Sequence, residues 1–126
     1  FIANNTGDLS KYTQVKQSPA YFGVSDLEVS QRWATSDDGT QVPYFLVCRS
    51  SACKFQPTLL YAYGGFEISE TPFYSGTLGR AWLERGGVYA LANIRGGGEF
   101  GPSWHQAAMK QNKMRSYEDL AAVARH

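Results

Sequence analysis

Three short segments of the chain carry residue types that can do chemistry. In the first, from Tyr61 to Phe66, an aromatic run ends at two glycines. Sites of α/β proteins lie at the carboxyl ends of buried strands, and a phenol hydroxyl placed there can stabilise a developing oxyanion as a backbone N–H does. Tyr63 is therefore a candidate oxyanion donor, with Gly64 and Gly65 shaping its turn. A core tyrosine before a purely structural turn is the alternative that these residues leave open.

The second segment is the glycine-rich run 96–101, which fits the Gly-x-Gly-x-x-Gly spacing of dinucleotide-binding loops and follows a predicted strand. Pro102 follows the run directly, and no further strand carries an acidic residue for a ribose. A turn that needs positive φ or close packing explains the same glycines. The run nevertheless defines an alternative function, a non-catalytic α/β module that binds a nucleotide or a protein partner through the loop from Gly96 to Gly101.

The third segment, from Gly101 to His105, resembles the Gly-x-Ser-x-Gly nucleophile elbow except that its last residue is a histidine. No apolar strand leads directly into Ser103, and a serine and a histidine two residues apart meet only through unusual backbone geometry. We therefore do not expect Ser103 to be a nucleophile, and we expect His105 to be a packed or surface residue.

The elements that must position these segments begin with a β-hairpin. Apolar and polar residues alternate over about residues 27–36 and 41–49, which predicts two strands. Between them, Asp38 and Gly39 supply the positive φ that tight hairpins need. Pro43 cannot donate to a ladder, so it should lie at an edge or near a strand start.

Alternating strands and helices are predicted after the hairpin. Residues 58–63 and 88–94 are almost entirely apolar, which predicts strands buried on both faces of a parallel sheet. Residues 75–85 between them are predicted to form a helix that ends at Gly86. This order predicts an α/β fold with a mostly parallel sheet.

A last helix is predicted to begin at Ser116 as its N-cap. Its predicted buried face consists of Tyr117, Leu120, Ala121 and Ala124. The chain reaches His126 inside this helix with only two buried-type strands, whose edges need further strands. We therefore expect a fragment whose remaining strands lie further on.

Composition excludes several functional classes. The chain has 126 residues, with 12 Lys and Arg against 11 Asp and Glu, so it shows no electrostatic footprint for nucleic acid or an anionic membrane. A hydrophobic fraction of 43% with 14% aromatic residues predicts a packed core. Cys48 and Cys53 can form a local bridge, although two free thiols at a strand end are the simpler expectation. No Cys/His set has zinc spacing, and we expect neither a metal nor a cofactor.

Longer motifs show a family resemblance. The stretch LLYAYGGFEISETPFYS, followed by GGVYALANIRGGGEFGPSWHQAAMKQNK and YEDLAAVA, closely resembles the prolyl oligopeptidase family of serine peptidases. QRWATSDDGTQVPYFLV is similar to the paired strands that open that family's catalytic domain. The resemblance covers about residues 17–126, and the motifs occur in the right order with the right spacing.

The resemblance implies an α/β-hydrolase domain capped by a β-propeller, and cleavage of short peptides on the carboxyl side of proline. It implies that Tyr63 is the oxyanion-hole tyrosine, that Phe66 is an aromatic wall of the proline pocket, and that Gly64 and Gly65 form the turn that sets both side chains. The family's catalytic Ser, Asp and His follow further along the chain, in that order. We therefore expect this chain alone to be inactive.

These inferences assemble into one expected organisation. Residues 1–26 are expected to be a linker or arm leaving a β-propeller outside this chain, and residues 27–126 the N-terminal portion of the peptidase domain, truncated before the nucleophile. The expected partners are short proline-containing peptides, the rest of the hydrolase domain and the propeller, with no nucleic acid and no membrane. We expect a cytoplasmic protein, and leave a periplasmic or secreted one open because the natural N-terminus is not seen.

Overall fold

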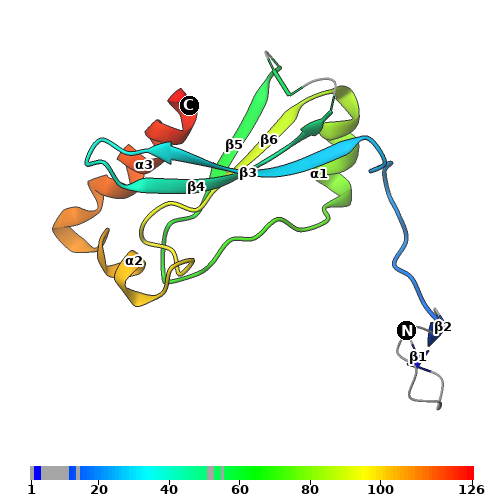
Figure 1. The fold of residues 1–126 in the computed structure, drawn as a ribbon, viewed down its shortest axis with the longest axis horizontal. Helices are drawn as coiled ribbons and strands as arrows, with labels where there is room; N and C mark the ends of the chain where they lie inside the picture. Colours follow the sequence, from blue (N-terminus) through cyan, green and yellow to red (C-terminus); the bar gives the residue numbers. More distant parts are fainter. Residues whose placement is uncertain (1, 4–11, 14, 51–52, 55) are drawn as a thin grey trace.

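A four-stranded mixed sheet organises the chain. The computed structural model describes residues 2–3, 12–13, 15–50, 53–54 and 56–126. The strands are β1 (Ile2–Ala3), β2 (Tyr12–Thr13), β3 (Leu27–Thr35), β4 (Gln41–Arg49), β5 (Thr58–Ala62) and β6 (Val88–Ala92). The helices are α1 (Gly76–Ala81), η1 (Leu83–Arg85), α2 (Pro102–Gln106), η2 (Lys110–Asn112) and α3 (Met114–Arg125). The main sheet has the order β3-β4-β6-β5, and β1 and β2 form a separate small ladder (Figure 1).

The predicted hairpin is confirmed. β3 and β4 pair antiparallel from Leu27 opposite Arg49 to Thr35 opposite Gln41. In the turn, Gly39 has a φ of 84°, the left-handed conformation that glycine adopts without strain. Pro43 lies near the start of β4, before the register with β6 begins at Tyr44, as its missing N–H predicts.

The two apolar runs form the predicted parallel pair, but they are not equally buried. β5 and β6 are parallel, with Leu60 opposite Ala90, and β6 is almost wholly buried. The prediction that the first run is buried on both faces is wrong for β5, where Leu59 and Tyr61 are 45% and 43% exposed. β5 is an edge strand of this sheet, and Thr58, Leu59 and Tyr61 are exposed on it.

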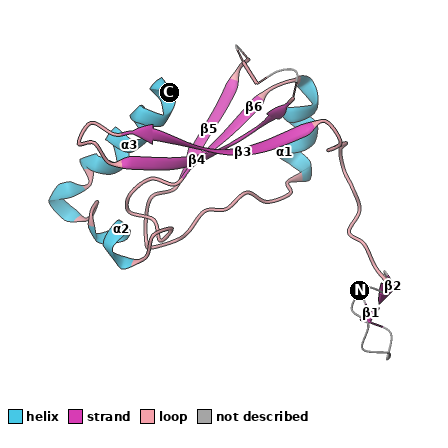
Figure 2. Cartoon of the chain, viewed as in Figure 1, coloured by secondary structure: helices cyan, strands magenta, loops and turns pink. Residues whose placement is uncertain are grey.

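One face of the sheet packs against α3 (Figure 2). The predicted helix is confirmed, but it begins at Met114, so Ser116 is not its N-cap. The predicted buried face is also wrong, because Tyr117 is 57% exposed. The residues that α3 buries are instead Ser116, Asp119, Ala122 and Val123. Two polar residues on that face find buried partners, which apolar periodicity alone could not indicate.

The segment predicted as one helix over 75–85 divides into two. Ser75 caps α1, since its Oγ accepts from the backbone N of Leu78 at 3.2 Å. The 3-10 turn η1 follows and ends at Gly86, whose φ of 86° confirms its predicted place after the helix. On the face opposite α3, side chains of α1, η1, β3, β4 and β6 enclose an apolar groove of about 340 Å³.

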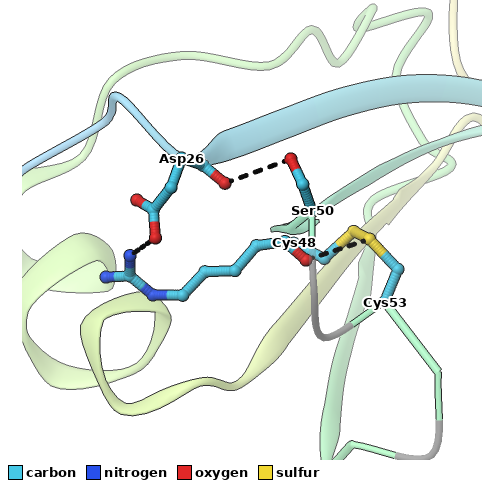
Figure 3. The surroundings of a disulfide bond; sticks show 5 residues. Asp26, Cys48, Ser50 and Cys53 are labelled. Carbon is cyan, nitrogen blue, oxygen red and sulfur yellow. Dashed lines mark hydrogen bonds and ion pairs between the residues drawn. A yellow bond between two sulfur atoms is a disulfide. The ribbon is translucent and has the colours of Figure 1, made fainter.

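The two cysteines are bridged, which overturns the expectation of free thiols. Cys48 lies in β4 and its Cα is 5.3 Å from that of Cys53, a separation that a disulfide spans (Figure 3). Beside the bridge, Arg49 forms an ion pair with Asp26, and Ser50 Oγ donates to Asp26 O at 3.4 Å. Disulfides are typical of oxidising compartments. The expected cytoplasmic location stays a prediction, and the disulfide argues against it. No helix in the described part of the chain is long and apolar enough to cross a membrane.

Candidate active site

The turn after β5 holds the candidate residues in a backbone shape that depends on glycine. Tyr63 follows the last residue of β5, and Gly64 has a φ of 60°. A Cβ on Gly64 would lie 2.5 Å from Ile94 Cγ1, so a larger residue would be both strained and crowded there. Phe66 also has a positive φ, of 51°, and the backbone N of Ile68 closes the turn by donating to Gly65 O at 3.0 Å. The turn therefore changes the chain direction sharply within a few residues.

This turn brings together the two predicted side chains. The rings of Tyr63 and Phe66 are stacked, with centroids 6.5 Å apart and planes 27° apart. Both are accessible, with Tyr63 43% and Phe66 82% exposed. A phenol hydroxyl and an apolar ring thus lie side by side at the carboxyl end of a parallel strand, where α/β proteins place their sites.

The glycine-rich run lies directly against the same turn, so its glycines have a packing role. A Cβ on Gly96 would lie 2.3 Å from Gly64 O, and one on Gly98 would lie 2.1 Å from Glu67 O. Two backbone hydrogen bonds join the segments, from Glu67 N to Gly96 O and from Gly98 N to Ile68 O. Only residues without a side chain permit two backbones to approach this closely. The geometry supports the structural interpretation of these glycines, and nothing in it favours a phosphate site.

A buried ionic network centred on Arg95 lies next to the glycine-rich run that contacts this turn. Arg95, which follows β6, is 3% exposed, and its Nε and Nη2 donate to the two carboxylate oxygens of Asp119 at 2.9 and 2.6 Å. Arg95 also pairs with Asp38 of the hairpin turn, and Ser36 Oγ donates to Asp119 Oδ1 at 2.6 Å. Such a bidentate Arg–carboxylate pair is strong and geometrically specific. The network therefore connects the β3–β4 turn, the end of β6 and α3.

Electrostatics within the network follow from these contacts. Hydrogen bonds from Arg95, and then from Thr40, hold the pKa of the Asp38 carboxyl far below its ordinary range. Hydrogen bonding to Asp119 raises the pKa of the Arg95 guanidinium. Arg95 is therefore a fixed positive charge at every pH at which the protein folds, and Asp38 is its ionised partner.

A lysine extends the network to the candidate turn. Lys113, the residue before α3, donates from Nζ to Gly64 O at 2.7 Å and to Ser116 Oγ at 3.1 Å. Ser116 Oγ in turn donates to Arg95 O at 2.7 Å. Sequence reasoning did not single out Lys113, Ser116 or Asp119 as partners of this turn. The available signal was the helical spacing of Ser116 and Asp119 with Ala122, which places two polar side chains on a buried face.

The elbow-like segment has no elbow geometry, in agreement with the sequence prediction. Ser103 lies inside the short helix α2, which begins at Pro102 after Gly101 rather than after a strand. His105 is packed against the glycine-rich run, with Nδ1 2.6 Å from Gly96 O. In the part of the chain that the structure describes, no three His, Cys, Asp or Glu side chains gather as metal ligands would.

Comparison with known proteins gives consistent relatives. Residues 75–126 match the model of the prolyl oligopeptidase family. An uncharacterized peptidase, y4nA of Sinorhizobium fredii, is 56% identical over 121 residues, which is 94% of this chain and 16% of that protein. A prolyl endopeptidase of Elizabethkingia miricola is 39% identical over 117 residues, covering 90% of this chain and 16% of that protein.

A solved structure agrees with these sequence relatives. The post-proline cleaving enzyme from Rickettsia typhi superposes with a TM-score of 0.82 at 40% identity, covering 88% of this chain and 16% of that one. Over most of its own length the chain is therefore similar to members of the prolyl oligopeptidase family. It spans about a sixth of the length of these relatives, 16% in each case. The family resemblance that the sequence motifs indicated is thus confirmed.

Proposed function

We propose that this chain forms the N-terminal portion of the catalytic α/β-hydrolase domain of a serine endopeptidase that cleaves short peptides after proline. The sheet order supports this, because β6 lies between β4 and β5 although it follows both in sequence. The open edge of β5 and the exposed faces of Leu59 and Tyr61 are suited to pairing and packing with further strands of the same domain. Residues 1–26 are proposed as the connection to a β-propeller, and residues 27–126 as the hydrolase portion.

In this proposal Tyr63 supplies one donor of the oxyanion hole, and Phe66 supplies an apolar wall for the proline ring. The observation that carries both roles is their arrangement, with stacked rings that remain accessible at the carboxyl end of β5. A hydroxyl held by a stiff turn can meet the charge of a tetrahedral intermediate without reorganising, which is how oxyanion holes lower barriers. The nucleophile, its base and the base's orienting acid are proposed to come from outside this chain, which would have no peptidase activity alone.

The test is Tyr63→Phe in the full-length enzyme, assayed with a proline-containing chromogenic peptide. The change deletes only the hydroxyl, so kcat should fall by ~10²–10³-fold, the usual cost of one oxyanion donor. KM should change little, because the charge exists only in the transition state. Tyr61→Phe is the matched control, since Tyr61 is equally exposed and lies two residues earlier, within β5. A Tyr63→Phe enzyme that keeps its fold and at least half of the parental kcat would refute the site.

Phe66→Ala tests the second role independently. Removing the ring opens the proposed pocket wall, so KM for the proline peptide should rise and discrimination against an alanine peptide should fall. Phe73→Ala is the control, because Phe73 is similarly exposed at 76%. Equal discrimination by the Phe66→Ala and parental enzymes would leave Phe66 as an ordinary surface aromatic.

A further inference from the structure

The carbonyl of Gly64 is one of the points where the Tyr63 turn contacts the rest of the fold. Its oxygen lies so close to Gly96 that a Cβ there would be 2.3 Å away, so backbone encloses it on that side. Lys113, the residue before α3, donates from Nζ to the same oxygen at 2.7 Å. A carbonyl that is enclosed in this way is costly to leave without a donor. Whatever holds the Lys113 ammonium group therefore also holds the backbone one residue after Tyr63.

The ammonium group of Lys113 is itself oriented. Its second contact is Ser116 Oγ, at 3.1 Å. Ser116 is 1% exposed and uses its hydroxyl proton on Arg95 O, so a lone pair of its oxygen faces the lysine. Arg95 is fixed in turn by Asp119, which accepts from both its backbone N and its guanidinium. The lysine thus transmits the geometry of the buried network to Gly64.

We propose that Lys113 is a positioning residue for the reaction, acting through the Gly64 carbonyl to set the place of the Tyr63 hydroxyl. The hydrogen bond that Lys113 makes to the turn goes to the backbone between Tyr63 and Phe66. The inference rests on the proposed role of Tyr63. It assigns to Lys113 an effect on kcat that should disappear when the Tyr63 hydroxyl is removed.

The experiment is a double-mutant cycle in the full-length enzyme. Lys113→Met keeps the length of the side chain and removes its donors and charge, so kcat should fall by ~10–100-fold, as expected for a catalytic group misplaced by up to about 1 Å. KM should stay within about twofold, because ground-state binding does not use the oxyanion donor. In the Tyr63→Phe background, the same Lys113→Met change should alter kcat by less than about twofold, since coupled residues are not additive.

The control is Lys110→Met, an exposed lysine three residues earlier, which should retain the parental kcat. Lys113→Arg retains a charged donor and provides the second variant if Lys113→Met does not fold; its kcat should lie between those of Lys113→Met and the parent, and its loss should show the same coupling to Tyr63→Phe. The inference is overturned if folded Lys113 variants keep kcat within twofold, or if their loss is as large in the Tyr63→Phe background. If Tyr63→Phe itself leaves kcat unchanged, the proposed function of Tyr63 fails instead, so the two failures are distinguishable.

Discussion

The two ends of the sheet are held together in opposite ways. At the end where β4 finishes, the disulfide joins Cys48 to Cys53, only 5 residues apart, beside an ion pair between Arg49 and Asp26. At the end where β5 and β6 finish, the network centred on Arg95 joins residues as distant in sequence as Ser36 and Asp119, which are 83 apart. One end is closed locally and covalently, whereas the other depends on buried polar contacts between distant elements. The candidate site lies at the second end.

This contrast indicates that the two ends of the sheet have different roles in stability and catalysis. Tyr63 and Phe66 are accessible, but the turn that carries them is fixed by glycine packing and by a charged network whose central pair, Arg95 and Asp119, is buried. A site that must not reorganise during reaction needs residues beneath it that hold its side chains in place. Changes at the network should therefore reduce both stability and catalysis, and changes at the disulfide should reduce stability alone.

The largest expected effect is on the network. Asp119→Asn removes the charge that pairs with Arg95 and leaves a buried guanidinium without its main partner, which typically costs ~3–5 kcal/mol of unfolding free energy. Denaturant unfolding of the full-length protein measures the loss, and the peptidase assay should show reduced kcat in the same variant. Glu118→Gln, the neighbouring residue of α3, should change the free energy of unfolding by no more than ~0.5 kcal/mol. If Asp119→Asn changed the free energy of unfolding as little as Glu118→Gln does, the Arg95 network would not be what stabilises this end of the sheet.

An intermediate effect is expected at the opposite end. Cys53→Ser opens a short loop, and the chain-entropy model gives a loss of about 2 kcal/mol for so small a loop. Because the loop lies far along the sheet from Tyr63, kcat of the folded enzyme should equal that of the parent. Adding a reductant should destabilise the parent but not the Cys53→Ser variant. If Cys53→Ser lowered kcat as strongly as Asp119→Asn, the proposed separation of the two ends would be wrong.

The smallest effect is a pH dependence at the margin of the network. The pKa of Asp38 is lowered in the folded state by hydrogen bonds from Arg95. The stabilisation that this pair contributes is therefore present above the ordinary carboxyl pKa of ~4 and is lost as the pH falls below it toward the folded-state value. Asp38→Asn should weaken this loss of stability in acid, measured by thermal melting between about pH 6 and pH 3.

Asp37→Asn provides the control for that pH dependence. Asp37 pairs with Arg125 at 2.7 Å, but both side chains are more than half exposed, at 60% and 59%. Such surface pairs contribute little to stability. If the melting temperature fell equally steeply with decreasing pH in the Asp38→Asn and parental proteins, the Asp38–Arg95 pair would not be linked to folding.

The elements that were predictable are those encoded in local patterns. The alternation over 27–36 and 41–49 marks the hairpin, and the two apolar runs mark β5 and β6, because strand formation depends on residues that are near one another. The Tyr63 turn was also predictable, since Gly64 and Gly65 interrupt an aromatic strand. The roles of Tyr63 and Phe66 themselves stay predictions until the enzyme assays are made.

The contacts that were not predictable join distant residues. Tyr117 suggested an apolar face for α3, but the face that is buried carries Ser116 and Asp119, whose partners lie at Arg95 and Ser36. Periodicity counts apolar side chains and does not detect a polar residue whose partner comes from another element. The exposure of β5 likewise depends on which segments pack beside it, and composition does not record that.

The separation of Ser36 from Asp119 by 83 residues also has a consequence for synthesis of the protein. The β3–β4 hairpin can pair soon after Arg49 leaves the ribosome, whereas its turn must wait for Arg95 and then for α3. At translation rates of about 5–20 residues per second, the interval between Ser36 and Asp119 lasts roughly 4–17 s. During that interval the end of the sheet that bears Tyr63 is incomplete, so it is completed later in synthesis than the hairpin to which it is attached.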